Sequence, residues 1–193
     1  MRFLAQNAFG LGVALVLVIA YAHNAYMGPS IEPIHFENET RALAASLPEH
    51  IRIPAVGIDA DFEAPLGVDE HGEIEVPKAF DTVAWYRYGP TPGEIGPAVV
   101  LGHVDSFIGP EVFYPLRDIE EGDHIEIERQ DGTTVEFGVT EVRYVSQDDF
   151  PTHDVYGDIP YAGLRLITCS GSFDHGTGHY SHNLIVFAKR IER

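Results

Sequence analysis

Short runs of alternating apolar and polar residues, separated by glycine and proline, fill the chain from residue 51 onward. The clearest run is His124–Arg129, in which isoleucines alternate with polar and charged residues, as in a half-buried strand. A turn at residues 130–132 and a second run at 133–139 follow it, and together they predict a β-hairpin. The other predicted strands lie at residues 51–54, 56–58, 62–68, 72–76, 98–103, 142–145, 164–169 and 184–188. Short strands at this close spacing are typical of an all-β barrel or sandwich.

The composition indicates a folded domain and excludes some classes of partner. The chain has 193 residues, of which 45% are apolar, and a formal charge of -18. This length fits one domain of ordinary size plus a short extra segment. The acidic excess argues against nucleic acid as a partner, because lysine and arginine bind phosphate backbones. It also argues against electrostatic docking to anionic lipid.

The N-terminal segment at residues 3–22 is apolar and carries no charge. It is just long enough for a helix that crosses a bilayer, which needs about 20 residues. A signal anchor is one interpretation, with Arg2 on the cytoplasmic side. A signal peptide cleaved after Ala22 is the other, because Ala20-Tyr21-Ala22 has the small-x-small form of a cleavage site. Both interpretations place the main domain outside the cytoplasm. The predicted segment, linker and β-domain occupy residues 1–23, 24–50 and 51–193.

Cys169 is the only cysteine, and it ends the predicted strand at residues 164–169. His103 follows another apolar run, residues 98–101, through a single glycine. A thiol and an imidazole at two strand ends are a common way to build a Cys–His nucleophile pair, in which the imidazole exchanges protons. The residues alone leave the ordinary alternatives open: a buried structural cysteine and a histidine in a turn. An unpaired thiol outside the cytoplasm is nevertheless unusual.

The segment at residues 170–183 is rich in small and polar residues and contains three histidines. Its first residues predict a flexible loop that exposes the sulfur at a barrel rim. His175, His179 and His182 would share one face of a helix and could then bind a metal. The glycines between them oppose a helix, so we predict no metal or cofactor. We expect this loop to supply polar donors to a developing oxyanion instead.

Four stretches of the chain, taken in this order behind an apolar segment, form a specific pattern. They are residues 52–60, 93–106, 109–123 and 164–188. In this order they resemble the sortases, a family of extracytoplasmic cysteine transpeptidases, and most closely their class F branch. The resemblance covers about residues 51–190. It implies an all-β fold, the eight-stranded sortase β-barrel with short helices, here preceded by an N-terminal apolar helix.

The resemblance also implies a reaction. Cys169 would attack the threonine carbonyl of a C-terminal sorting signal similar to Leu-Pro-x-Thr-Gly and form a thioester. His103 would protonate the leaving amine and deprotonate the incoming one. The implied partners are secreted proteins that bear such a signal, an amine of a cell-wall precursor, and the membrane through residues 3–22. Transfer to water instead of an amine would make the enzyme a hydrolase.

One departure from the family concerns its arginine, which steadies the substrate or the oxyanion. No arginine lies between Cys169 and Arg190. His175 occupies the position of the class F arginine, and Arg165 shares the predicted face of Cys169, so we expect one of them to replace it. A third alternative is donation by His182 or Asn183 at the start of the next strand. The remaining candidates for contact with substrate or oxyanion are Asp105, Thr168, His182 and Asn183. Asp105 would orient His103 or meet the substrate, unless it only caps a turn.

A different class of function also fits the sequence. The chain would then be a non-enzymatic secreted β-domain whose histidine-rich loop binds a metal or a partner protein. That hypothesis predicts a function indifferent to Cys169, whereas the enzyme hypothesis requires the thiol.

Overall fold

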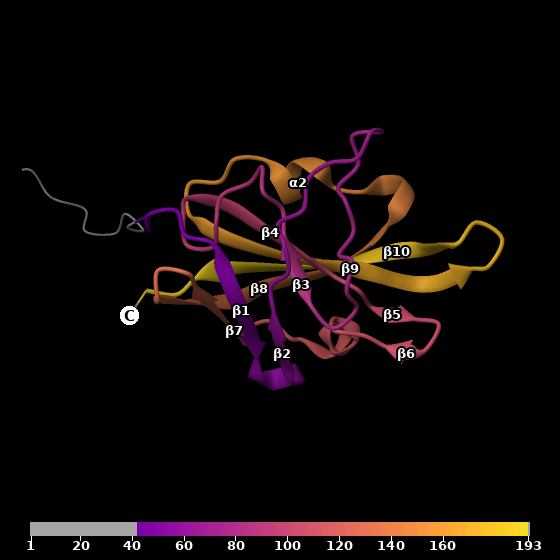
Figure 1. Cartoon of the computed structure of the whole chain (residues 1–193), viewed down its shortest axis with the longest axis horizontal. Helices are drawn as coiled ribbons and strands as arrows, with labels where there is room; N and C mark the ends of the chain where they lie inside the picture. Colours follow the sequence, from indigo (N-terminus) through magenta and orange to yellow (C-terminus); the bar gives the residue numbers. More distant parts are fainter. Residues whose placement is uncertain (1–41, 193) are drawn as a thin grey trace, which may run out of the picture. The chain divides into compact units, whose positions relative to one another are not determined.

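A single eight-stranded sheet, rolled into a nearly closed barrel, dominates the computed structural model, which describes residues 42–192 (Figure 1). The strand order is β2-β1-β7-β8-β10-β9-β4-β3, and a β-bridge between Phe62 and Val83 links the two edges. Every neighbouring pair is antiparallel except β4 and β9, which are parallel. The predicted all-β, eight-stranded architecture is therefore confirmed. The predicted N-terminal apolar helix lies outside the described residues.

The elements of the barrel are spread along the described chain. Its strands are β1 (Pro48–Ile53), β2 (Ile58–Asp61), β3 (Val83–Trp85), β4 (Gly96–Gly102), β7 (His124–Arg129), β8 (Thr134–Ser146), β9 (Ala162–Asp174) and β10 (His179–Arg190). A separate two-stranded ribbon contains β5 (Asp105–Ser106) and β6 (Gly109–Pro110). The helical elements are short: η1 (Pro54–Val56), η2 (Tyr114–Asp118), η3 (Gln147–Asp149) and α2 (Thr152–Tyr156). Within residues 42–192, no helix is long and apolar enough to span a membrane.

Alternation along β9 sends successive side chains to opposite faces of the sheet. Leu164 and Leu166 point into the barrel interior, where they join the main apolar core. Ile167 points outward and packs with Val155 of α2 in a second apolar cluster. By the same alternation, the side chain of Thr168 points into the barrel and that of Cys169 points outward. The two residues therefore meet different surroundings.

The hairpin after Cys169 differs from the expected flexible loop. Strand β9 continues past Cys169 to Asp174 and pairs with β10, so Cys169 lies within a strand. Near the tip, Phe173 packs on Tyr180 with ring centroids 5.2 Å apart, which extends the pairing. Gly171 has a φ of +82°, and a Cβ there would lie 2.4 Å from Ser181 Oγ. Glycine thus permits the irregular pairing beside Cys169, and the prediction of a flexible stretch is wrong.

Several of the other predicted strands are present with changed bounds, whereas those at 56–58, 62–68 and 72–76 are wrong: residues 54–56 form η1, and β2 begins only at Ile58. The expected strand at residues 142–145 is the second half of the single long strand β8. The runs at 62–68 and 72–76 pair only through isolated bridges, such as that between Val68 and Ile74. Strand β3 was not predicted, because its three residues are too few to show a period.

Arg129, at the end of β7, is a buried cation that ties three segments together. Its guanidinium donates to the Pro92 carbonyl at 3.1 Å, the Ala44 carbonyl at 2.8 Å and the Asp131 carboxylate at 2.7 Å. Its side chain is 1% exposed, whereas that of Asp131 is 40% exposed. The two carbonyl contacts are thus the better shielded part of the network.

We expect Arg129→Met to lower the free energy of unfolding by about 3 kcal/mol, because two carbonyls lose their donor away from water. Denaturant unfolding of both proteins measures the difference. Arg52→Met is a matched control, since Arg52 is 41% exposed and pairs with Glu128 at the surface. It should have a much smaller effect. Equal losses in the two variants would contradict this account of Arg129.

Candidate active site

The parallel pairing of β4 with β9 places the end of β4 beside the middle of β9, although the two strands are far apart in the sequence. Leu101 is the register partner of Ile167. His103 and Cys169 each follow two residues later, and neighbouring strands run about 4.8 Å apart. Both residues line one cavity of about 220 Å³, which we call the His103 cavity. The fold therefore places an imidazole and a thiol beside the same small space.

Contacts with two loops orient the imidazole of His103. Its Nε2 lies 2.8 Å from the Pro77 carbonyl oxygen. A carbonyl only accepts, so Nε2 carries a hydrogen, and the lone pair of the neutral ring is on Nδ1. The ring also packs on Phe80, with centroids 4.7 Å apart. Nδ1 is thus the ring atom that can exchange a proton with a reacting group.

Cys169 is exposed to solvent and lines two cavities at once. Surrounding protein atoms nevertheless remove water from the sulfur. This burial, followed by the negative charge of Asp105, raises the pKa of the Cys169 thiol above its ordinary value. Both effects disfavour the thiolate. At neutral pH the thiol of Cys169 is therefore mostly protonated, and it would need a base to act as a nucleophile.

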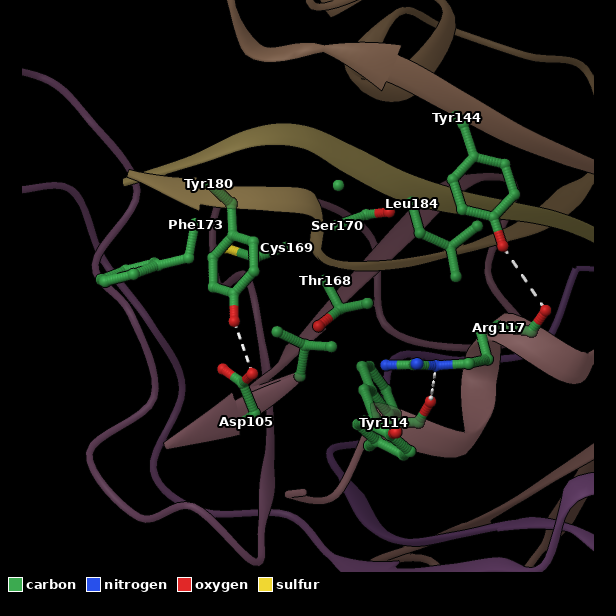
Figure 2. Close-up of a pocket in the computed structure, with 13 residues that line it drawn as sticks. Asp105, Tyr114, Arg117, Tyr144, Thr168, Cys169, Ser170, Phe173, Tyr180 and Leu184 are labelled. Carbon is green, nitrogen blue, oxygen red and sulfur yellow. Dashed lines mark hydrogen bonds between the residues drawn. The ribbon is translucent and has the colours of Figure 1, made fainter. Parts of the chain in front are cut away.

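Asp105 and Tyr180 form a contact next to the sulfur (Figure 2). The Tyr180 hydroxyl donates to Asp105 Oδ2. Burial, together with this bond to a carboxylate, raises the pKa of Tyr180 to about 12, and the positive charge of Arg117 acts in the opposite direction. The predicted role for Asp105 as an orienting partner of His103 gains no support, because the hydrogen bond it makes is to Tyr180.

We expect Asp105→Asn to lower the pKa of Cys169, because it removes the neighbouring negative charge while the burial remains. The rate of alkylation by iodoacetamide as a function of pH measures the pKa. At any pH well below that pKa, a thiol that is tenfold more acidic has roughly ten times as much thiolate, so the alkylation rate rises with it. Asp158→Asn is the control, since it removes one charge from an exposed residue that does not line either cavity. If the pH profile of alkylation gives an unchanged or a higher pKa for Cys169 in Asp105→Asn, the prediction is contradicted.

Three other predicted residues lie around Cys169 in distinct ways. Asn183 is its direct partner across the β9–β10 pairing, shares its face and also lines the His103 cavity. Thr168 is 4% exposed, and its hydroxyl has no hydrogen-bond partner among the described residues. His182 pairs with Ser170 on the other face, and its Nδ1 contacts Ser181 Oγ at 2.8 Å.

The two residues predicted to replace the family arginine lie elsewhere. Arg165 is buried on the outer face, donates to the carbonyls of Leu164 and Asp154, and stacks on Phe187 at 4.6 Å. His175 is at the hairpin tip, against Phe173 at 5.1 Å. Neither lines a cavity that contains Cys169.

The structure brings a different arginine to the site, Arg117 of η2. It lines a second cavity beside Cys169, of about 460 Å³, which we call the Arg117 cavity. Its guanidinium lies flat on the Tyr114 ring, 3.5 Å from the centroid, and Nε donates to the Tyr114 carbonyl at 3.0 Å. The sequence did not point to Arg117, because the expected replacements lie near Cys169 along the chain and Arg117 does not. Only the packing of η2 against the barrel end brings the two together.

The placement of the hairpin histidines bears on the alternative of a metal site. Within residues 42–192, no three histidine, cysteine or acidic side chains are placed so that they could hold a metal ion. The histidines of the hairpin are spread along it. His175 is at the tip, and His182 lies against Ser181.

Comparisons with known proteins agree with the geometry. The profile of the sortase domain matches residues 51–191. Sortase C-1 from Actinomyces oris has a TM-score of 0.58 at 20% identity, over 75% of this chain and 72% of that one. Sortase A from Corynebacterium diphtheriae has a TM-score of 0.54 at 22% identity, over 79% and 64%.

A lid mutant of Streptococcus agalactiae sortase C1 is similar over more of the chain. Its TM-score is 0.57 at 22% identity, and the match covers 94% of this chain and 89% of that one. No curated protein sequence matches the chain significantly. At these identities the solved structures establish the fold, and the domain profile establishes the family. The chain belongs to the sortase family.

Proposed function

We propose that this chain is a class F-type sortase that cleaves a Leu-Pro-x-Thr-Gly-like sorting signal and transfers it to an amine of the cell envelope. The observation that carries the proposal is the cavity that His103, just after β4, shares with Cys169, within the neighbouring parallel strand β9. The class F assignment depends on Phe173-Asp174-His175, which resembles the Phe-Asp-Arg that class F members often carry. We also propose that residues 3–22 anchor the enzyme to the membrane, with its domain outside the cytoplasm.

The reaction proceeds in two steps whose protons pass through His103. In the first, Cys169 Sγ bonds to the threonine carbonyl carbon, the peptide C–N bond breaks, and the thiol proton passes to the leaving amine. In the second, the incoming amine forms a new C–N bond and the C–S bond breaks. The proton of the amine then returns to the sulfur. Asn183, on the face of Cys169, is positioned to donate to the oxyanion of either step.

A larger cavity next to the catalytic pair supports binding of an extended signal peptide. This cavity of about 790 Å³ shares Leu101, Ile167 and Asn183 with the His103 cavity. It runs along the outer face of β4 and β9, and Phe150 and Tyr156 form part of its wall. Such an apolar groove suits the leucine and proline of a sorting signal, with the scissile bond directed to Cys169.

Intact-mass measurement after mixing with sorting-signal peptides tests the proposal. We expect an adduct equal to the fragment up to threonine, located on Cys169 by peptide mapping and released by hydroxylamine, as a thioester is. Added amine should convert the released product from an acid to an amide, which separates a transpeptidase from a hydrolase. No adduct across a panel of signal peptides would refute the proposal.

A further inference from the structure

We propose that the Arg117 cavity is the acceptor site of this enzyme and that Arg117 recognises a carboxylate carried by the acceptor amine. The inference deepens the proposed function and rests on it. The ligand class is an amine that bears a carboxylate, as a short peptide with free ends does.

The first argument is the position of the Arg117 cavity relative to the His103 cavity. The two cavities share Asp105, Thr168, Cys169 and Tyr180 in their walls, so they meet at the sulfur. They then diverge: Asn183 lines the His103 cavity but not the Arg117 cavity, whereas Arg117 lines the Arg117 cavity but not the His103 cavity. Acyl transfer needs a second substrate that reaches the thioester while the first still occupies its groove. A separate cavity that opens on the same sulfur meets that need.

The second argument is the charge distribution inside the cavity. Arg117 is the only lysine or arginine among the residues that line it, and it forms no ion pair with any described carboxylate. In a chain of net charge -18, a guanidinium without an ion pair in the wall of this cavity gives a carboxylate beside Cys169 a site of attraction. Tyr114 holds it from below by stacking and through its carbonyl. The planar guanidinium of Arg117 is thus preorganised to bind an anion.

Asp105 supplies the opposite charge at the other end of the cavity. Figure 2 shows Asp105 beside Tyr180 and Cys169, whereas Arg117 lies across the pocket with Tyr114 and Tyr144. An ammonium group would be attracted to Asp105, near the sulfur, and a carboxylate to Arg117. This polarity would orient an amino-acid-like acceptor with its amine toward the thioester.

The third argument is an unsatisfied polar group in the wall. The Thr168 hydroxyl belongs to a residue 4% exposed and has no hydrogen-bond partner among residues 42–192. Buried hydroxyls are normally hydrogen-bonded, and Thr168 lines both cavities, so a polar atom of either substrate is a candidate partner. The amide or amine of a bound acceptor would supply that partner.

Partition of the acyl-enzyme between two matched amines tests the inference. Diglycine and diglycinamide differ in the carboxylate and have similar amine basicity. We expect the wild type to transfer to diglycine roughly tenfold better, as one charge-assisted contact implies. Arg117→Gln should bring the ratio close to one. Arg87→Gln is the matched control, since Arg87 is an exposed arginine that also stacks on a tyrosine, and it should keep the wild-type ratio.

Three results would overturn the inference: no preference in the wild type, the same preference in Arg117→Gln, or an equal loss in Arg117→Gln of transfer to both amines and to water. The third would mean that Arg117 acts on the oxyanion. Binding to unacylated protein distinguishes these results from failure of the proposed function. NMR titration of Cys169→Ala should show tighter binding of diglycine than of diglycinamide, and Arg117→Gln should remove the difference. Equal binding of the two ligands would overturn the inference even if no acyl-enzyme ever forms.

Discussion

Cys169→Ala is expected to form no adduct with a sorting-signal peptide and to transfer no acyl group to an amine. A methyl group offers no electron pair, and Cys169 is the only thiol of the chain. Because the residue is exposed, its loss should change the free energy of unfolding by less than about 0.5 kcal/mol. Intact mass, product chromatography and denaturant unfolding together separate lost chemistry from lost folding.

Cys169→Ser sharpens the same test. It keeps the size and polarity of the side chain, but an alcohol is a far weaker nucleophile than a thiolate. The serine variant should therefore be almost as inactive as the alanine variant. Substantial amide product from either variant would place the nucleophile elsewhere and contradict the proposed function.

His103→Gln is expected to slow both thioester formation and aminolysis by about 10²- to 10⁴-fold, the usual contribution of a general acid–base. The side-chain amide of glutamine can still donate a hydrogen bond to the Pro77 carbonyl, so the variant can keep the contact that His103 makes with this loop. What it lacks is a nitrogen lone pair that can accept a proton from a reacting group. Single-turnover rates with a signal peptide, measured with and without an added amine, report the two steps separately.

His175→Gln is the matched control for this prediction. His175 is a candidate from its sequence position, but it lies at the hairpin tip against Phe173. Its replacement should leave the rate close to that of the wild type. A large loss in His175→Gln with little loss in His103→Gln would reverse the assignment of roles.

The barrel was largely predictable, because a half-buried strand leaves a period of two in the sequence. The hairpin of β7 and β8 shows this best, with buried Ile125 and Ile127 alternating with more exposed residues. Strand β3 and the extension of β9 to Asp174 were not predictable in the same way. The first is too short to show a period, and the second is held by pairing with β10 instead of burial.

The chain order alone identified Cys169 and His103 as a candidate pair, since both follow apolar runs that must be buried. Only the tertiary structure determined which arginine lies near the sulfur of Cys169. Arg165 shares a strand with Cys169 but turns to Phe187, whereas Arg117 reaches the pocket because η2 packs at the barrel end. Periodicity reports which face of a strand a side chain occupies. It carries no information on which distant segment will cover that face, because that depends on sheet register and loop packing.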